Sequence, residues 1–228
     1  MAAVLLRAEA SVAAIGETSG QLALRDPDIR VMLRVRADEP GAFEELVEQY
    51  QQRLVAVLHH VVGNAEEAED LAQEVFFRIY RARKKYRARS KFSTWLFTIA
   101  NNLALNALRR RQRKPVVPLN VRDSGPLGPR PAEQLVRDPG SGPVQKVQRQ
   151  ELAIVIRQAL DGLSERQRMA VMLNKFEDMG YAEIAAVMRL STKAVKSLLS
   201  RARSNLRVAL QDYIYMDGEL VPKPPAEG

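Results

Sequence analysis

Residues 91–111 read KFSTWLFTIANNLALNALRRR, and this stretch determines how the rest of the chain is interpreted. In a helix, its apolar residues would recur at a spacing of three to four and face a core. They are Trp95, Leu96, Ile99, Ala100 and Leu103. The opposite side is polar, because Thr98, Asn102 and Asn106 recur at every fourth residue and lead to three arginines at 109–111. Amides suit base edges and guanidinium groups suit phosphates, so the stretch predicts a helix that contacts nucleic acid.

The charge around this helix is strongly one-sided. Residues 75–121 contain thirteen lysines and arginines and no Asp or Glu. Five aromatic residues interleave with these charges: Tyr80, Tyr86, Phe92, Trp95 and Phe97. A basic groove that contains aromatic rings is typical of proteins that stack unpaired bases. The alternative interpretation is that the aromatic residues form a core and the charges form a solvated face.

The composition limits the class of protein. The chain has 228 residues and a formal net charge of +8, which favours an acidic partner such as nucleic acid. It contains no cysteine, which excludes disulfides and thiolate zinc sites. No apolar run is long enough to span a bilayer, and the first residues lack a basic start before their apolar part. We therefore expect a cytoplasmic protein without membrane insertion, and an all-α fold because alternating β-branched residues are scarce.

The first predicted domain spans residues 28–113, after an N-terminal extension of residues 1–27. Its pattern indicates an amphipathic helix that ends at Gly63, with Pro40 at a helix start. Asn64 can cap the next helix, whose apolar face comprises Ala68, Leu71, Ala72, Val75, Phe76 and Ile79. Acidic residues dominate before residue 75 and basic residues dominate after it. This polarity predicts a domain that docks one partner with its acidic half and DNA with its basic half.

Three carboxylates, Glu66, Asp70 and Glu74, fall four residues apart on one helix face. A metal-dependent nuclease is the enzyme hypothesis that this spacing allows. A solvated or protein-docking face is favoured over it, because carboxylates on a single helix diverge unless a second element completes the coordination. We therefore expect no metal, no cofactor and no catalysis.

Residues 114–146 are rich in Pro, Gly and Ser and predict a linker between two domains. The second domain spans residues 147–212 and is followed by a disordered tail at 213–228. Ser164 can cap a helix with a capping-box partner at Gln167. Two further helices joined by a short turn at Leu190 and Ser191 match a helix-turn-helix pattern.

The second of these helices separates into two faces. Its core side contains Ala194, Val195, Leu198, Leu199, Ala202 and Leu206. Its outward side contains short polar or basic residues, namely Lys193, Lys196, Ser197, Ser200, Arg201 and Ser204. Such side chains can enter a major groove and contact bases or phosphates. An ordinary three-helix packing unit with a basic face remains the alternative.

Three segments carry a resemblance to a known family. DLAQEVFFRIYRA at 70–82, residues 91–111, and LSERQRMAVMLNKFEDMGYAEIAAVMRLSTKAVKSLLSRARSNLR at 163–207 resemble bacterial sigma factors of the extracytoplasmic-function group. The resemblance covers roughly residues 28–112 and 147–210, in the family's order and spacing. It departs from the family at Gly180, where a serine is usual, and in a linker that is not acidic.

The resemblance implies a role for each predicted site. Asp70, Gln73 and Glu74 would contact core RNA polymerase. A second group would melt and recognise the minus-ten promoter element: Lys91, Phe92, Ser93, Thr94, Trp95, Thr98, Asn102, Asn106, Arg109 and Arg110. A third group would contact the minus-thirty-five element as duplex: Lys193, Lys196, Ser197, Ser200 and Arg201. Promoter DNA and an anti-sigma factor would be the other partners, and the protein would have no catalysis of its own.

Two other hypotheses remain open at this stage. A helix-turn-helix repressor or activator would bind duplex DNA as a dimer and would leave the basic, aromatic block unexplained. A nuclease would use the carboxylates at 66–74 and would cleave DNA in the presence of divalent ions.

Overall fold

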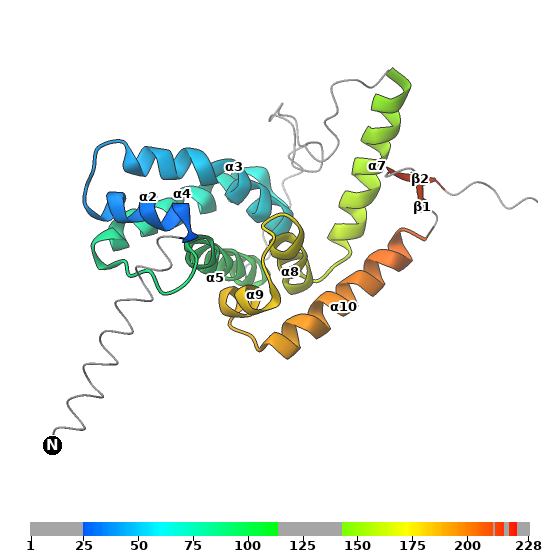
Figure 1. Cartoon of the computed structure of the whole chain (residues 1–228). Coiled ribbons are helices and arrows are strands. Elements are labelled where there is room, and N and C mark those ends of the chain that lie inside the picture. Colours follow the sequence, from blue (N-terminus) through cyan, green and yellow to red (C-terminus); the bar gives the residue numbers. More distant parts are fainter. Residues whose placement is uncertain (1–24, 114–142, 212, 217–218, 223–228) are drawn as a thin grey trace, which may run out of the picture. The chain divides into compact units, whose positions relative to one another are not determined.

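Figure 1 shows the computed structural model of the chain, which describes residues 25–113, 143–211, 213–216 and 219–222. The described residues form two compact units. The first contains most of helices α2 to α5, and the second contains most of helices α7 to α10 and a short hairpin. This architecture confirms the predicted all-α fold with two helical domains.

The first unit begins with α2 (Pro27–Arg36) and α3 (Ala42–Val62). The predicted helix with its start at Pro40 and its end at Gly63 corresponds to α3, whereas α2 was not predicted as a separate helix, and the chain turns between the two. Asp38 and Gly41 adopt positive φ angles of 58° and 79° there, which no α-helix can accommodate. Asp26 caps α2 by accepting a hydrogen bond from the Asp28 amide at 3.0 Å.

Helix α4 (Ala65–Ala82) follows the sequence prediction closely. The Asn64 side chain accepts the Glu67 amide at 2.7 Å, as expected for an N-cap residue. All six predicted apolar positions are buried. A short 3₁₀ helix, η1 (Arg83–Lys85), follows α4 directly. It begins the segment of residues 83–91 that joins α4 to α5, which we call the basic loop.

Helix α5 (Phe92–Arg113) runs through the core of the first unit. Leu96, Ala100 and Leu103 are buried as predicted, whereas Trp95 and Ile99 are only half-buried. Phe92 and Phe97 are fully buried instead. The largest buried side chains of the unit come from α2, α3, α4 and α5, and they are Ile29, Met32, Leu46, Tyr50, Leu54, Leu58, Ile79, Phe92, Leu96 and Phe97.

The second unit consists of α7 (Pro143–Asp161), α8 (Glu165–Lys175), α9 (Tyr181–Met188) and α10 (Thr192–Ala209). The predicted capping box at Ser164 and Gln167 is present. Helix α10 packs against α7 and α8. Helix α7 begins within the predicted linker, whose residues 114–142 lie outside the described part of the chain.

The chain continues after α10 as two antiparallel strands, β1 (Tyr213–Met216) and β2 (Glu219–Pro222). Tyr213 pairs with Pro222, and Met216 pairs with Glu219. The prediction of a disordered tail from residue 213 was therefore wrong for these eight residues. None of the helices in the described ranges is long and apolar enough to cross a membrane.

Candidate nucleic-acid interface

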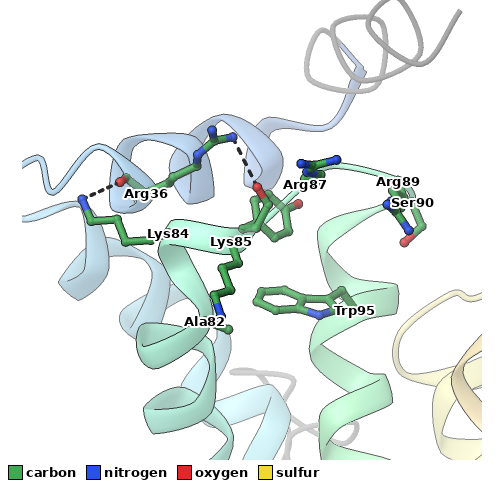
Figure 2. Close-up of a pocket in the computed structure, with 9 residues that line it drawn as sticks. Arg36, Ala82, Lys84, Lys85, Arg87, Arg89, Ser90 and Trp95 are labelled. Atoms are coloured by element: carbon green, nitrogen blue, oxygen red, sulfur yellow. Dashed lines mark hydrogen bonds between the residues drawn. The ribbon is translucent and has the colours of Figure 1, made fainter. Parts of the chain in front are cut away.

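A basic pocket of about 740 Å³ lies beside the loop that joins α4 to α5 in the first unit. Figure 2 shows how basic side chains and the indole of Trp95 surround it. The lining residues are Arg36, Ala82, Lys84, Lys85, Tyr86, Arg87, Arg89, Ser90 and Trp95. Five of these nine residues carry a positive charge and none carries a negative charge.

The conformation of the loop explains why its cations face outward. Tyr86 and Ala88 are buried, whereas Arg87 and Arg89 are exposed. This alternation is the one that an extended segment produces when one of its sides packs on a core. The two arginines are therefore presented on the side of the loop that faces solvent.

The aromatic wall of the pocket rests on the core. Trp95 lies with its ring centroid 4.9 Å from that of Tyr86 and 6.0 Å from that of Phe92. Phe92 is fully buried and contacts Tyr50 edge-on at 5.3 Å. Phe92, which was predicted to contact DNA, therefore supports the Trp95 ring from within the core, and a direct contact between Phe92 and DNA is not supported. Burial, together with the nearby carboxylate of Asp26, raises the pKa of Tyr86, so its phenol stays neutral.

Hydrogen bonds between the start of the loop and α2, and between the loop and the turn after α2, fix the start of the loop. The Arg36 guanidinium donates to the Tyr86 carbonyl at 3.3 Å, and Lys84 Nζ donates to the Arg36 carbonyl at 3.0 Å (Figure 2). Asp38 accepts from Lys84 and, at 2.8 Å, from Arg83 Nε. The hydrogen bonds from Lys84 and Arg83 hold the pKa of Asp38 below its usual value of 3.8.

The remaining cations of the pocket do not hold the loop in place through hydrogen bonds within the described residues. Lys85, Arg87 and Arg89 are exposed and make no hydrogen bond or ion pair within the described residues. Their charge is therefore available to a polyanion. Sequence reasoning placed them in the basic block but did not assign them to the site, and it missed Arg36 entirely.

The polar residues predicted along α5 differ in their exposure. Lys91, Asn106, Arg109 and Arg110 are exposed, and Ser93, Thr98 and Asn102 are half-buried. The Thr98 hydroxyl donates to the Thr94 carbonyl at 2.7 Å, and Thr94 itself is buried. A direct DNA contact by Thr94 is therefore not supported.

The residues predicted to contact polymerase lie on the outer face of α4. Asp70 and Gln73 are exposed, and Glu74 is half-exposed with an ion pair to Arg78 at 2.7 Å. Phe77 follows at helical spacing and is 54% exposed, which is unusual for so large an apolar side chain. Sequence reasoning did not include Phe77, although its spacing from Gln73 and Glu74 placed it on the same face. No cluster of three His, Asp or Glu side chains that could hold a metal occurs among the described residues.

Helix α10 presents its predicted DNA-binding face to solvent. Ser191 caps the helix by accepting the Ala194 amide at 3.1 Å, and Val195, Leu199 and Ala202 are buried. The five predicted contact residues are all exposed: Lys193, Lys196, Ser197, Ser200 and Arg201. Arg201 donates to the Ser197 hydroxyl at 3.1 Å, which orients its guanidinium along the helix surface.

Tyr181, the first residue of α9, is a further residue that sequence reasoning missed. Its ring lies 5.9 Å from the Lys196 ammonium, and its hydroxyl accepts from Arg203 at 3.4 Å. Both contacts connect α9 to α10. Tyr181 therefore holds two basic side chains of α10 in place.

Two family models match the chain. Residues 46–114 match sigma-70 region 2, and residues 153–206 match sigma-70 region 4. The first match contains the basic loop and all of α5, and the second contains α8, α9 and most of α10.

Curated relatives align over almost their whole length. The RNA polymerase sigma-H factor of Pseudomonas aeruginosa is 34% identical over 187 residues, which cover 82% of this chain and 95% of the relative. The ECF RNA polymerase sigma factor SigW of Bacillus subtilis is 31% identical, covering 78% of this chain and 94% of the relative. The ECF RNA polymerase sigma-E factor of Escherichia coli is 30% identical, covering 79% and 93%. These relatives are sigma factors rather than enzymes, which contradicts the nuclease hypothesis.

Solved structures share the fold. The complex of CnrH with the cytosolic domain of CnrY matches with a TM-score of 0.57 and 21% identity, over 82% of this chain and 98% of that chain. RpoE from Bartonella quintana, solved with the anti-sigma factor NepR, matches with a TM-score of 0.57 and 24% identity, over 75% and 98%. With both sigma-70 regions present in order and relatives aligned over almost their whole length, this chain belongs to the extracytoplasmic-function group of sigma-70 RNA polymerase sigma factors.

Proposed function

We propose that this sigma factor directs core RNA polymerase to promoters by recognising two DNA elements with its two units. The first unit recognises the minus-ten element as separated strands, and the second recognises the minus-thirty-five element as duplex. The observation that carries the first part is the basic pocket beside Trp95. A repressor that binds only duplex DNA has no use for such a pocket.

The pocket has the two properties that capture of an unpaired base requires. Cations at Lys85, Arg87 and Arg89 can neutralise backbone phosphates, and the exposed part of the Trp95 ring can stack on a base. Such stacking is worth about 1 to 3 kcal/mol for each base and does not depend on its identity. Selection among bases would then come from side chains near the pocket, and the amides of Asn102 and Asn106 are our candidates.

The exposed face of α10 supports recognition of the minus-thirty-five element. A helix of this width fits the major groove, and Ser197, Ser200 and Arg201 can contact base edges or phosphates from one face. Lys193 and Lys196 add positive charge near the helix N-terminus. We expect these two to contribute mainly phosphate contacts.

Core polymerase is the partner we assign to the outer face of α4. Asp70, Gln73 and Glu74 supply a polar rim there, and the exposed ring of Phe77 supplies an apolar anchor. The RpoE structure contains an anti-sigma factor, and we expect a partner of that class to regulate this protein as well. We place its action in the cytoplasm, where bacterial transcription takes place.

The test of the minus-ten proposal is the variant Trp95→Ala, assayed in complex with core polymerase. A promoter carrying 2-aminopurine in the minus-ten region reports strand separation by fluorescence. Loss of stacking should reduce the melted fraction by about tenfold. Trp95→Phe is the matched control, because it keeps an aromatic face and should retain most of the melting. Native gel binding to core polymerase should be unchanged in both variants.

Two outcomes would contradict the proposal. Normal melting by Trp95→Ala would show that the pocket does not capture a base. Equal loss of polymerase binding and melting would show that Trp95 has only a structural role.

A further inference from the structure

Helix α2 and its N-cap residue contact the basic loop near both ends of the loop. Helix α2 lies outside the segment matched to sigma-70 region 2, which begins at residue 46. We propose that α2 is a positioning element for the DNA pocket: Asp26 and Arg36 hold the two ends of residues 86–92 and thereby determine how well the first unit captures an unpaired base. This inference rests on the proposed recognition of the minus-ten element.

The first contact completes the N-terminus of α5. The first N–H groups of a helix have no partner within the helix. Lys91 precedes α5, and a lysine side chain cannot cap these groups because it contains no hydrogen-bond acceptor. Asp26 Oδ2 accepts the Phe92 amide at 2.9 Å, although the two residues are 66 positions apart. A carboxylate at this place is also favoured by the helix dipole. Asp26, the N-cap residue of α2, therefore also caps α5.

This cap acts directly on the pocket. Trp95 lies in the first turn of α5, where its amide donates to the Lys91 carbonyl at 3.4 Å. A displaced first turn would move the indole away from Tyr86, against which it packs.

Asp26 uses both of its carboxylate oxygens, and this property allows a selective test. Oδ1 accepts the Asp28 amide at 3.0 Å and caps α2, whereas Oδ2 caps α5. An asparagine at this position has the same shape but only one acceptor oxygen. Asp26→Asn therefore cannot satisfy both helices.

The second contact fixes the other end of the loop. Arg36 lies at the C-terminus of α2 and donates to the Tyr86 carbonyl at 3.3 Å (Figure 2). The Arg36 carbonyl in turn accepts from Lys84 at 3.0 Å. Arg36→Gln removes the guanidinium that reaches Tyr86. Arg30→Gln is the matched control, because Arg30 is an exposed arginine of α2 that makes no hydrogen bond or ion pair within the described residues.

The first measurement uses the full chain without DNA. Trp95 is the only tryptophan in the sequence, so its quenching by neutral acrylamide reports the accessibility of the pocket wall. Asp26→Asn and Arg36→Gln should each raise the quenching constant by about 1.5-fold or more, a change expected when a half-buried ring loses its support. Arg30→Gln should match the wild type. Unchanged quenching in both test variants would overturn the proposal, whatever the DNA experiments show.

The second measurement uses the complex with core polymerase and 2-aminopurine promoter DNA. Asp26→Asn and Arg36→Gln should lower the melted fraction by about fivefold to tenfold, the effect of losing one ordinary hydrogen bond, with polymerase binding unchanged. Wild-type melting by both variants, alongside defective melting by Trp95→Ala, would refute the positioning role and leave the pocket proposal intact. Normal melting by Trp95→Ala would refute the pocket proposal, and the quenching result would still decide whether α2 positions the loop.

Discussion

Neutralising Lys85, Arg87 and Arg89, the pocket cations that make no hydrogen bond or ion pair within the described residues, gives the most quantitative prediction. The variant is Lys85→Gln, Arg87→Gln and Arg89→Gln combined in one chain. These side chains are exposed and make no ion pair within the described residues, so their removal costs the folded state little. Their proposed role is to neutralise phosphates of the separated strand.

The magnitude follows from counterion release. Each phosphate neutralised on a single strand contributes about 0.7 to the slope of log affinity against log salt concentration. Three contacts therefore contribute about 2 to this slope. Between about 50 and 200 mM salt, the wild-type affinity should fall roughly twentyfold more than that of the triple variant.

Fluorescence anisotropy of a labelled single-stranded oligonucleotide, titrated with the polymerase complex at several salt concentrations, measures this slope. Arg30→Gln serves as the control for removal of a charge from the same unit at a site without a proposed DNA contact. An unchanged slope in the triple variant would refute the reasoning. A slope change per charge equal to that of Arg30→Gln would also refute it, because the effect would then come from net charge alone.

Three further predictions concern other parts of the chain. Arg201→Ala should weaken binding to the minus-thirty-five duplex by about 1 to 3 kcal/mol if Arg201 contacts a base. Footprinting on promoter variants measures this preference, and an unchanged preference would exclude Arg201 from the contact residues. Gly180 caps α9 with its backbone only, because its amide donates to the Glu183 carboxylate at 2.8 Å. Gly180→Ser should therefore raise the free energy of unfolding, measured in urea, by about 0.5 kcal/mol. Gly41→Ala should lower it by about 1 kcal/mol, because Gly41 adopts a φ angle of +79°. The pKa of Asp38 is lowered in the folded state, so its ionised form stabilises the fold above pH 3.8, and this contribution is lost as the pH falls through the folded pKa. Asp38→Asn should therefore flatten the acid limb of the curve of stability against pH. An unchanged acid limb would contradict the ion pair.

Helix α4 shows what local pattern can predict. Its cap and its buried face follow from the spacing of Asn64 and six apolar residues, because one amphipathic period and one cap determine a surface helix. Helix α10 was predicted for the same reason. Helix α2 was not predicted as a separate element, although Pro40 marked the start of the next helix, because Pro and Gly are compatible both with the start of a helix and with a turn.

The pocket shows what local pattern cannot predict. Arg36 lies 50 residues from Tyr86, and Asp26 lies 66 residues from Phe92, so neither contact has a periodic signature. The burial of Phe92 depends on Tyr50 in another helix, and sequence reasoning therefore assigned to DNA an aromatic residue that belongs to the core. The hairpin after α10 did carry a local indication, since the sequence YIYMDGELVP places an Asp-Gly pair between two apolar runs.

In vitro transcription from a library of genomic fragments, with core RNA polymerase and start-site mapping, tests the central claim most directly. The account predicts that this protein creates new start sites preceded by two shared motifs at a fixed spacing, one for each unit. Binding to core polymerase with new starts that share only one motif would contradict the assignment of an element to each unit. Cooperative binding to duplex DNA without core polymerase, together with no new starts, would contradict promoter recognition as part of the polymerase.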